Sequence, residues 1–353
     1  MEGWYMALKA KDIAQMLGVS TATVSLVLNN KPGVGEAKRQ EIIEKIQELG
    51  CEYMLKDLPG GNGSIGFVVY KTIGSIIDES PFFTYILEGI NKNILNSGYT
   101  LNFVYLDREM AKEELQAQIR AMNCKGLIIF GVEMTRQDLQ AFVDTGIPFV
   151  VLDNSMRESD VDSVTINNAQ GTSKALHYLY EMGHRRFGYL MSKERITSFE
   201  ERYQAYVNTL SSLGVERLPE DVCIVEYKDS VIRGQVREFL AARKEPMPTA
   251  FFAENDYIAC SALQGMKEAG YKIPQDFSII GFDDRPICTM VNPNMTTICV
   301  PKDDFGIQSV NLLLSRINSS RQHSLKVELG TWLLVRGSVR RLEPEEGAAG
   351  SGT

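Results

Sequence analysis

The segment between residues 11 and 29, KDIAQMLGVSTATVSLVLN, constrains the fold of this chain more than any other. Apolar residues recur at helical spacing on both sides of Gly18, so each side predicts a short helix with one apolar face. Gly18 suits a tight turn, and Ser20 is placed to cap the second helix. Two short helices joined in this way predict a helix-turn-helix, whose second helix enters the major groove of DNA. The apolar positions are Ile13, Ala14, Leu17, Val24 and Leu28.

The same segment, together with the helix expected over residues 36–49, resembles the lactose and galactose repressor family of bacterial transcription regulators. The resemblance implies a three-helix headpiece over residues 8–50 that binds double-stranded operator DNA, and a hinge or linker over residues 51–64. A small helical unit used only for protein contacts is the alternative. The matching runs are Asp12-Ile13-Ala14, Gly18-Val19-Ser20, Thr23-Val24-Ser25 and Val27-Leu28-Asn29.

The resemblance places Thr21, Ala22 and Leu26 against base edges. Ala22 and Leu26 offer apolar surface that suits only a thymine methyl group, so we expect a thymine-rich half-site under this helix. Packing of Leu26 on a neighbouring turn is an equal alternative. The net charge of the chain is -8, and the local positive excess near the helices is small. Neutral donors are therefore expected to anchor the phosphates: Ser20, Thr23, Ser25 and Asn29.

In the family, a hinge helix forms on DNA and inserts a leucine into the minor groove, and Leu55 or Leu58 can take that part here. The surrounding sequence matches the family poorly, because Cys51 stands where the family has Tyr and Pro59 follows Leu58 at once. Either leucine can instead be an exposed linker residue or pack against the core.

Beyond a breaker-rich stretch at residues 58–64, short β-branched and aromatic runs alternate with helical stretches. This alternation predicts an α/β fold with two doubly wound parallel-sheet lobes. The strands are expected at residues 65–70, 101–106, 126–131, 148–153, 187–191, 222–226, 249–253 and 277–281. The helices are expected at residues 83–96, 112–122, 136–144, 170–182, 199–213, 231–241 and 256–269.

The family resemblance implies that these lobes form a core of the periplasmic-binding-protein type over residues 65–342, in which the chain crosses between the lobes three times. The first lobe then comprises about residues 65–166 and 299–328, and the second about 167–298 and 329–342. Residues 343–353, EPEEGAAGSGT, are expected to be a disordered tail. The tail has no apolar heptads, so we expect a homodimer and not a coiled-coil tetramer.

Polar side chains follow several of the expected strands, and ligands of doubly wound sheets lie outside those strand ends. Arg202 matches the effector-binding arginine of the family, although it can instead pair with Glu200 or Glu201 on its own helix. A small carbohydrate suits such donors and acceptors beside an aromatic face. Family members that bind purines, sugar phosphates or a phosphorylated partner protein keep those alternatives open. The candidate effector-binding residues are Phe82, Phe83, Asp153, Arg202, Asn255 and Asp283.

Catalysis is not expected. The sequence has no GxxxxGK[ST], HExxH or GxSxG motif, and the adjacent carboxylates Asp283-Asp284 and Asp303-Asp304 point apart on an extended segment. Asp256, Asp284 and His184 are expected in structural roles. A two-lobed sugar-binding protein or a carbohydrate-active enzyme without specific DNA function is the alternative interpretation.

The cysteine pattern bears on metal sites and cofactors, and the hydropathy bears on where in the cell the protein acts. The six cysteines are scattered singly along the chain, and the three histidines form no cluster. We therefore expect reduced thiols, no metal site and no cofactor. No apolar run approaches the roughly 18 residues that cross a bilayer, and the N-terminus lacks a signal-peptide pattern. We therefore expect a cytoplasmic protein without membrane contact.

Overall fold

The computed structural model describes residues 9–29, 31–49, 54–55, 61–79, 82–242, 247–319 and 321–343. The chain divides into two compact units, Met1–Ser64 with Leu95–Thr100, and Ile65–Ile94 with Leu101–Thr353. Each unit is described by itself. Leu58 and the expected tail beyond residue 343 lie outside the described residues.

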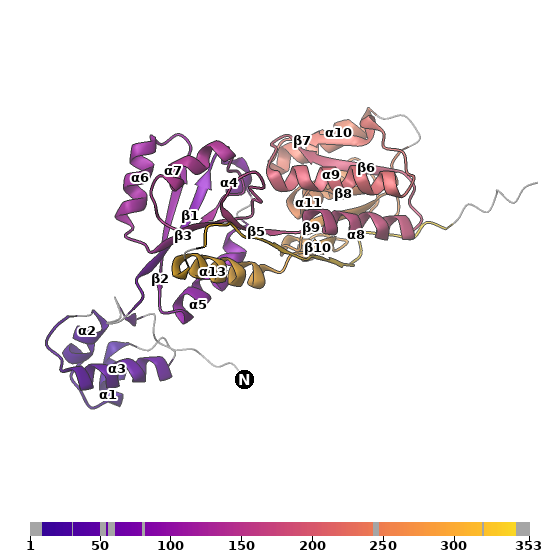
Figure 1. Cartoon of the computed structure of the whole chain (residues 1–353). Coiled ribbons are helices and arrows are strands. Elements are labelled where there is room, and N and C mark those ends of the chain that lie inside the picture. The colour runs from indigo at the N-terminus through magenta and orange to yellow at the C-terminus, as the bar shows by residue number, and fades with distance from the viewer. Residues whose placement is uncertain are drawn as a thin grey trace, which may run out of the picture. The chain divides into compact units, whose positions relative to one another are not determined.

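The N-terminal unit contains a helix-turn-helix followed by a third helix (Figure 1). The turn residue Gly18 has a φ of 63°, which glycine adopts at no steric cost. The Ser20 hydroxyl accepts a hydrogen bond of 3.0 Å from the Thr23 amide, which confirms the predicted cap. Apolar side chains of all three helices close one small core. The helices are α1 (Ala10–Met16), α2 (Thr21–Leu28) and α3 (Glu36–Glu48).

The first lobe of the larger unit is built on a six-stranded sheet of order β11-β5-β4-β3-β1-β2. Strands β1, β3, β4, β5 and β11 pair in parallel. The strands are β1 (Ser64–Lys71), β2 (Thr100–Asp107), β3 (Gly126–Phe130), β4 (Phe149–Leu152), β5 (Asp162–Ile166) and β11 (Lys326–Leu329). Its helices are α4 (Ser75–Glu79), α5 (Thr84–Asn96), α6 (Lys112–Ala121), η2 (Arg136–Asp138), α7 (Leu139–Val143) and α13 (Lys302–Asn318).

The second lobe repeats the plan with the order β12-β10-β9-β8-β6-β7, in which only β12 pairs in antiparallel fashion among the described strands. The strands are β6 (Phe187–Ser192), β7 (Val222–Val225), β8 (Ala250–Ala253), β9 (Ser278–Asp283), β10 (Thr296–Cys299) and β12 (Trp332–Leu334). The helices are α8 (Asn168–Glu181), α9 (Thr197–Ser212), η3 (Pro219–Asp221), α10 (Asp229–Ala241), α11 (Asp256–Glu268) and α12 (Ile287–Met290).

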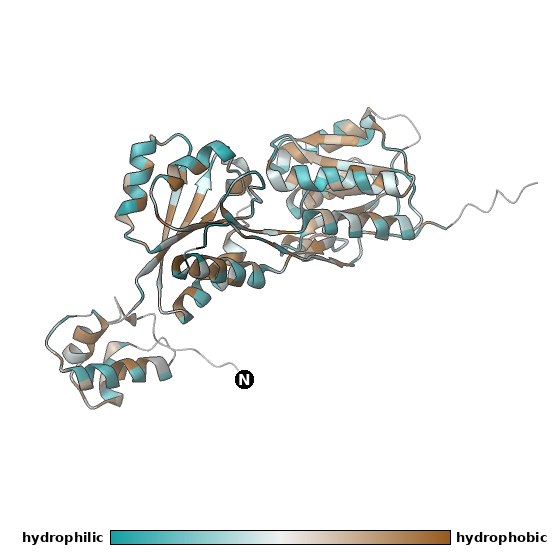
Figure 2. Cartoon of the chain, in the orientation of Figure 1, coloured by the Kyte–Doolittle hydropathy of each residue, from teal (hydrophilic) through white to brown (hydrophobic). Residues whose placement is uncertain are grey.

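These two sheets confirm the predicted fold class. The chain passes from one sheet to the other after β5, after β10 and after β11. The central strands are apolar along their length because helices cover both faces of a parallel sheet. Figure 2 shows this as brown strands inside each lobe and teal on the outer helix surfaces. The lobe boundaries given above stay predictions.

The part of the chain that the structure describes has five free cysteines and no long apolar helix. Cys124, Cys223, Cys260, Cys288 and Cys299 form no disulfide, and all but Cys124 are buried. Within these same ranges, no helix is long and apolar enough to cross a membrane.

Candidate effector pocket and DNA-reading helix

Three strand ends place polar side chains in one cavity of the larger unit. Asp153 follows β4, Asn255 follows β8, and Asp283 ends β9. Together with Arg202 and Phe82 they line a narrow space of about 30 Å³, which we call the inner pocket. The carboxyl ends of parallel strands therefore converge as the sequence led us to expect. The structure brings these five of the six candidate residues together.

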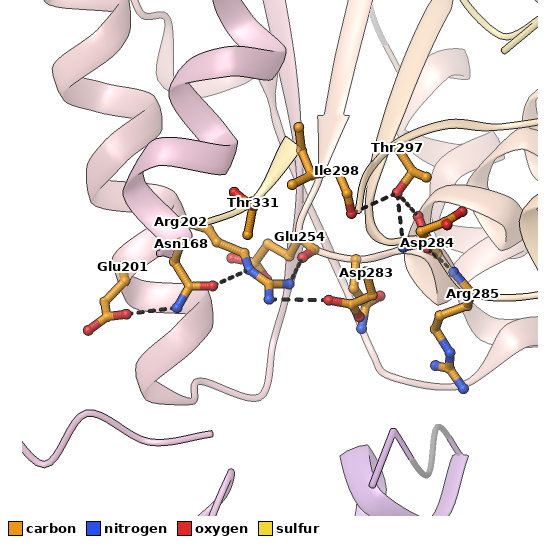
Figure 3. A network of polar contacts seen from close by, with 12 residues as sticks. Asn168, Glu201, Arg202, Glu254, Asp283, Asp284, Arg285, Thr297, Ile298 and Thr331 are labelled. Atoms are coloured by element: carbon orange, nitrogen blue, oxygen red, sulfur yellow. Dashed lines mark hydrogen bonds and ion pairs between the residues drawn. The ribbon is translucent and has the colours of Figure 1, made fainter. Parts of the chain in front are cut away.

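Arg202 is committed to contacts with the protein (Figure 3). Its Nε donates to Asn168 Oδ1 at 2.9 Å, Nη2 donates to Asp283 Oδ1 at 3.3 Å, and Nη1 donates to the Glu254 carbonyl oxygen. The guanidinium also lies 3.7 Å from the ring centroid of Phe282. Only 3% of the residue is exposed. Arg202 thus holds the second lobe's strand ends together, and it does not pair with the acidic residues of its own helix.

Asp153 is the unpaired charge of the inner pocket. Only 9% of Asp153 is exposed, and its carboxylate accepts no hydrogen bond from the described residues. Burial raises the pKa of the Asp153 carboxyl to about 7, against the attraction of Arg202 and with added repulsion from Asp283. Burial also raises the pKa of Asp283, again against Arg202. The pocket therefore favours a ligand that donates hydrogen bonds to these carboxylates.

Asn255 fixes one aromatic wall of the pocket. Its Oδ1 accepts from the Ile258 amide at 3.0 Å and caps α11, while its Nδ2 donates to the Tyr227 hydroxyl at 2.6 Å. Tyr227 stacks on Tyr257 with a centroid distance of 5.0 Å and lies near the Phe199 ring. Tyr227 and Phe199 both line the pocket. Sequence reasoning missed Tyr227, although an aromatic residue just after β7 was a usable signal.

Phe83 does not line the inner pocket, which corrects the expectation that both phenylalanines face a ligand. Phe82 lines it, whereas Phe83 is buried beside the rings of Phe67, Phe103 and Phe130 in the first lobe. The reason is local, because the two residues precede α5 and successive side chains there point in different directions.

A buried glutamate positions the first-lobe side of the pocket. Glu133 accepts hydrogen bonds from the amides of Thr72, Ile73 and Gly74 at 2.8 to 2.9 Å, and from the Ile77 amide at 3.3 Å. These bonds fix the loop that leads into α4, and Ile77 lines the pocket. Nothing in the sequence pattern indicated this role.

Two contacts join the lobes beside the pocket. Tyr257 on α11 donates its hydroxyl hydrogen to Glu79 on α4 at 2.7 Å. The Arg285 guanidinium lies 5.5 Å from the ring centroid of Tyr85 on α5. In Figure 3 the Arg285 side chain extends away from the Arg202 network.

The residues expected in structural roles make structural contacts. Asp256 accepts from the Thr297 hydroxyl at 2.6 Å, and Asp284 pairs with Arg336 at 2.6 Å. The buried His184 lies 2.8 Å from the Thr249 hydroxyl, and burial lowers the pKa of its imidazole to about 4. In the described ranges, no group of three or more His, Cys, Asp or Glu side chains is arranged to hold a metal ion.

The second helix of the N-terminal unit presents its first turn to solvent. Thr21 and Ala22 are exposed, while Leu26 is half-buried and lies close to Gly33 in the following turn. The Asn29 amide donates to the Ser25 carbonyl oxygen at 2.8 Å. The side chains expected to read DNA are thus exposed or half-buried, and their contacts with DNA stay predictions. The exposed members are Ser20, Thr21, Ala22, Ser25 and Asn29, and the half-buried ones are Thr23 and Leu26.

Leu55 packs into the core of the N-terminal unit, where it is 8% exposed. Insertion of this side chain into a minor groove therefore requires that it leave the cluster formed with residues such as Ile13 and Ile46. The second hinge candidate, Leu58, lies outside the described residues.

Two family models match the chain. The model for bacterial regulatory proteins of the lacI family matches residues 9–52, and the model for a periplasmic binding protein-like domain matches residues 176–339. The HTH-type transcriptional repressor PurR of Actinobacillus pleuropneumoniae serotype 3 (strain JL03) is 29% identical over 340 residues, which cover 94% of this chain and 98% of the relative. PurR of Pasteurella multocida (strain Pm70) is 28% identical over 336 residues, with the same coverage.

Solved structures give the same result. The transcriptional regulator CelR, in complex with cellobiose, has a TM-score of 0.69 and 25% identity, covering 94% of this chain and all of that one. A LacI family regulator from Enterococcus faecium with bound ribose has a TM-score of 0.67 and 24% identity, covering 79% of this chain and all of that one.

A helix-turn-helix unit followed by a two-lobed core with polar strand ends defines a DNA-binding transcription regulator with an effector-binding core. The chain carries a helix-turn-helix domain that matches the lacI family of bacterial regulatory proteins and a periplasmic binding protein-like domain, and the relatives named above are PurR repressors. Its relatives are repressors and not enzymes, so the alternative of a carbohydrate-active enzyme is set aside.

Proposed function

We propose that this chain acts in the cytoplasm as a dimeric repressor whose operator affinity is set by a small carbohydrate bound between the lobes. The observation that carries the proposal is the inner pocket, where the unpaired carboxylate of Asp153 lies beside the aromatic rings of Phe82, Phe199 and Tyr227. A sugar supplies hydroxyl donors for the carboxylate and C–H surface for the rings.

The charges of the inner pocket support a neutral ligand. Its one cation, within the described lining, is Arg202, whose donors already serve Asn168, Glu254 and Asp283. A phosphate would bring negative charge beside two carboxylates and find no free donor of this kind. The cellobiose and ribose carried by the solved relatives agree with a carbohydrate.

Repression follows from the spacing of two DNA-reading helices. A dimer reads two half-sites about one helical turn or a multiple apart, so the N-terminal units must be held at matching separation. A ligand that binds one arrangement of the lobes better than the other shifts the population that fits the operator. Induction results if the ligand favours the mismatched arrangement, and co-repression results if it favours the matched one.

The test is operator binding by the full-length protein. Selection from random duplexes identifies the bound sequence, and fluorescence anisotropy then measures its Kd with and without sugars. We expect a symmetric site and a Kd that changes by at least about tenfold with one sugar. Asp153→Asn should keep operator binding and lose most of the sugar response, whereas the exposed first-lobe variant Asp144→Asn should keep both. Failure to retain any duplex, with or without sugars, contradicts the proposal.

A further inference from the structure

The end of β9 carries the pocket residue Asp283 in an unusual backbone conformation. Asp283 has a φ of 109° and Asp284 has a φ of 52°, so two consecutive residues with side chains lie in the left-handed region that favours glycine. Such strain persists only where surrounding contacts hold it, and it concentrates at ligand-binding sites. The structure must therefore supply groups that keep this turn in place.

Lys302 holds the turn from the start of α13. Its Nζ atom donates to the carbonyl oxygen of Asp283 at 2.7 Å and to that of Asp284 at 2.8 Å. Successive carbonyl groups of an extended strand point in opposite directions, so both can meet one ammonium group only because the backbone turns here. The positive charge also offsets the repulsion between the two carbonyl oxygens. Lys302 thus favours the turn over a regular continuation of the strand.

The turn brings the Asp283 carboxylate to Arg202. Side chains alternate between the two faces of a strand, and Gly281, two residues earlier, faces Asp256 on α11. A regular strand would direct Asp283 to that same face. Its Oδ1 instead accepts from Arg202 Nη2 at 3.3 Å (Figure 3), and that guanidinium lies over the ring of Phe282, which belongs to the opposite face. The left-handed backbone therefore places the carboxylate of Asp283 in the inner pocket.

Other groups hold only the far end of the turn. The Arg285 amide donates to Asp256 Oδ2 at 2.8 Å, and the Asp284 carboxylate pairs with Arg336 at 2.6 Å. Among the described residues, Lys302 is the side chain that donates to the Asp283 carbonyl oxygen. Lys302 is not among the described residues that line the inner pocket, so its effect on a ligand there must pass through Asp283.

The ammonium group also acts on the charge of Asp283. Burial raises the pKa of the Asp283 carboxyl, and the positive charges of Arg202, Arg285 and Lys302 oppose that rise. Loss of Lys302 would therefore also favour the protonated carboxyl, which accepts hydrogen bonds less well. This effect on charge is the smaller one, because two arginines remain.

We infer that Lys302 is a positioning residue for effector binding, which acts through the backbone of Asp283 and Asp284 and not through contact with the ligand. The inference rests on the proposed function for the class of ligand. It adds a residue outside the pocket that controls the pocket carboxylate. Lys302 directly follows the segment in which the chain passes from β10 to α13, so this control comes from a crossing between the lobes.

Isothermal titration of the full-length protein with ribose and cellobiose tests the inference in two backgrounds. Lys302→Met removes the ammonium group and keeps most of the stem, so it should weaken binding of the sugar by at least about tenfold. Lys302→Arg keeps the charge and the donors, and its affinity should stay within about threefold of the natural chain. In an Asp284→Gly background, glycine adopts the left-handed conformation without steric cost, so Lys302→Met should cost no more than about threefold. An equal loss in both backgrounds overturns the inference.

Lys267→Met is the matched control. Lys267 Nζ also donates to a backbone carbonyl oxygen of the second lobe, that of Asn292 at 3.0 Å, but not to the turn after β9. The control should leave sugar affinity within about twofold of the natural chain. If Lys302→Met does not fold, Lys302→Gln takes its place in the same comparison.

Crystal structures of the ligand-free natural chain and of Lys302→Met test the inference without a sugar. We expect the variant to lose the left-handed φ at Asp283 or Asp284, together with the contact between Asp283 and Arg202. An unchanged turn and an unchanged contact overturn the inference, whatever the titrations give. Failure of the natural chain to bind ribose or cellobiose bears on the proposed function alone, and the two crystal structures then decide the inference.

Discussion

The buried carboxyl of Asp153 should make the stability of the ligand-free protein depend on pH in a predictable direction. Burial raises its pKa from 3.8 to about 7, so the folded chain keeps a proton that the unfolded chain has already lost between those values. The contribution of Asp153 to the free energy of unfolding is fully present below about pH 4, and it is lost as the pH rises through about 7. Most carboxylates that pair in folded proteins act in the opposite direction.

The size of the effect follows from the two pKa values. With 3.8 for the unfolded chain and about 7 for the folded one, Asp153 contributes roughly 2–3 kcal/mol more to the free energy of unfolding at pH 5 than at pH 8. Asp153→Asn removes the titration and keeps the shape. Asparagine also tolerates the φ of 63° at this position, so the substitution adds little backbone strain.

Urea unfolding at pH 5, 6, 7 and 8 measures the difference between the natural chain and Asp153→Asn. We expect the variant to gain stability relative to the natural chain by about 2–3 kcal/mol from pH 5 to pH 8. Sugar affinity of the natural chain should rise about tenfold from pH 6 to pH 8, because hydroxyl donors bind the ionised carboxylate better. Parallel stability profiles for the two proteins would refute the assignment of a raised pKa to Asp153.

Three further substitutions in the protein and one in the operator DNA test other contacts. Ser20→Ala removes the cap of α2 and should cost about 1 kcal/mol of headpiece stability with weaker operator binding by anisotropy, whereas Ser20→Asn should retain both. Arg202→Lys keeps the charge but loses the planar fork, so sugar titration should show at least about tenfold weaker binding; unchanged affinity would remove Arg202 from the site. Tyr257→Phe breaks the bond to Glu79 and should weaken sugar binding a few-fold, or about 1 kcal/mol, and an unchanged titration would argue against coupling through this bond. Replacing thymine by uracil under Ala22 should weaken operator binding if the methyl group is read, and equal binding would disprove that contact.

The regular elements were predictable where hydrophobic period and turn residues agreed. The strand β3 is a continuous apolar run, and α11 keeps a helical apolar period after Asn255, which caps it although the sequence analysis did not assign it that role. The short strands β5, β10, β11 and β12 were missed because their sequences mix polar and apolar residues, and their pairing depends on how the chain passes between the sheets. The family resemblance carried that topology, whereas periodicity did not.

The polar part of the inner pocket was predictable because strand ends of a parallel sheet must converge. What escaped prediction depends on side-chain direction and on long-range contacts. Phe83 turns into the first-lobe core, and Glu133 binds amides some 60 positions away in the chain, at Thr72 and Ile73. A larger cavity of about 600 Å³, lined by the loops after β3 and β4 and by the start of α9, was also unforeseeable, since no local pattern encodes the spacing of those loops.

The balance between the two arrangements of the lobes can be argued from the contacts that join them. The exposed hydrogen bond from Tyr257 to the Glu79 carboxylate favours the described arrangement by about 1 kcal/mol. Against it, the buried Nε and Nη1 atoms of Arg285 have no hydrogen-bond partner among the described residues, which costs about 1–3 kcal/mol. The Ser155 hydroxyl also donates to Glu201 on α9 at 3.1 Å, and the exposed Arg157 lies 3.2 Å from the same carboxylate. Exposed contacts of this kind contribute about 1 kcal/mol or less each, so together they favour the described arrangement by no more than a few kcal/mol. A modest difference in sugar affinity between the two arrangements is then enough to decide which one prevails.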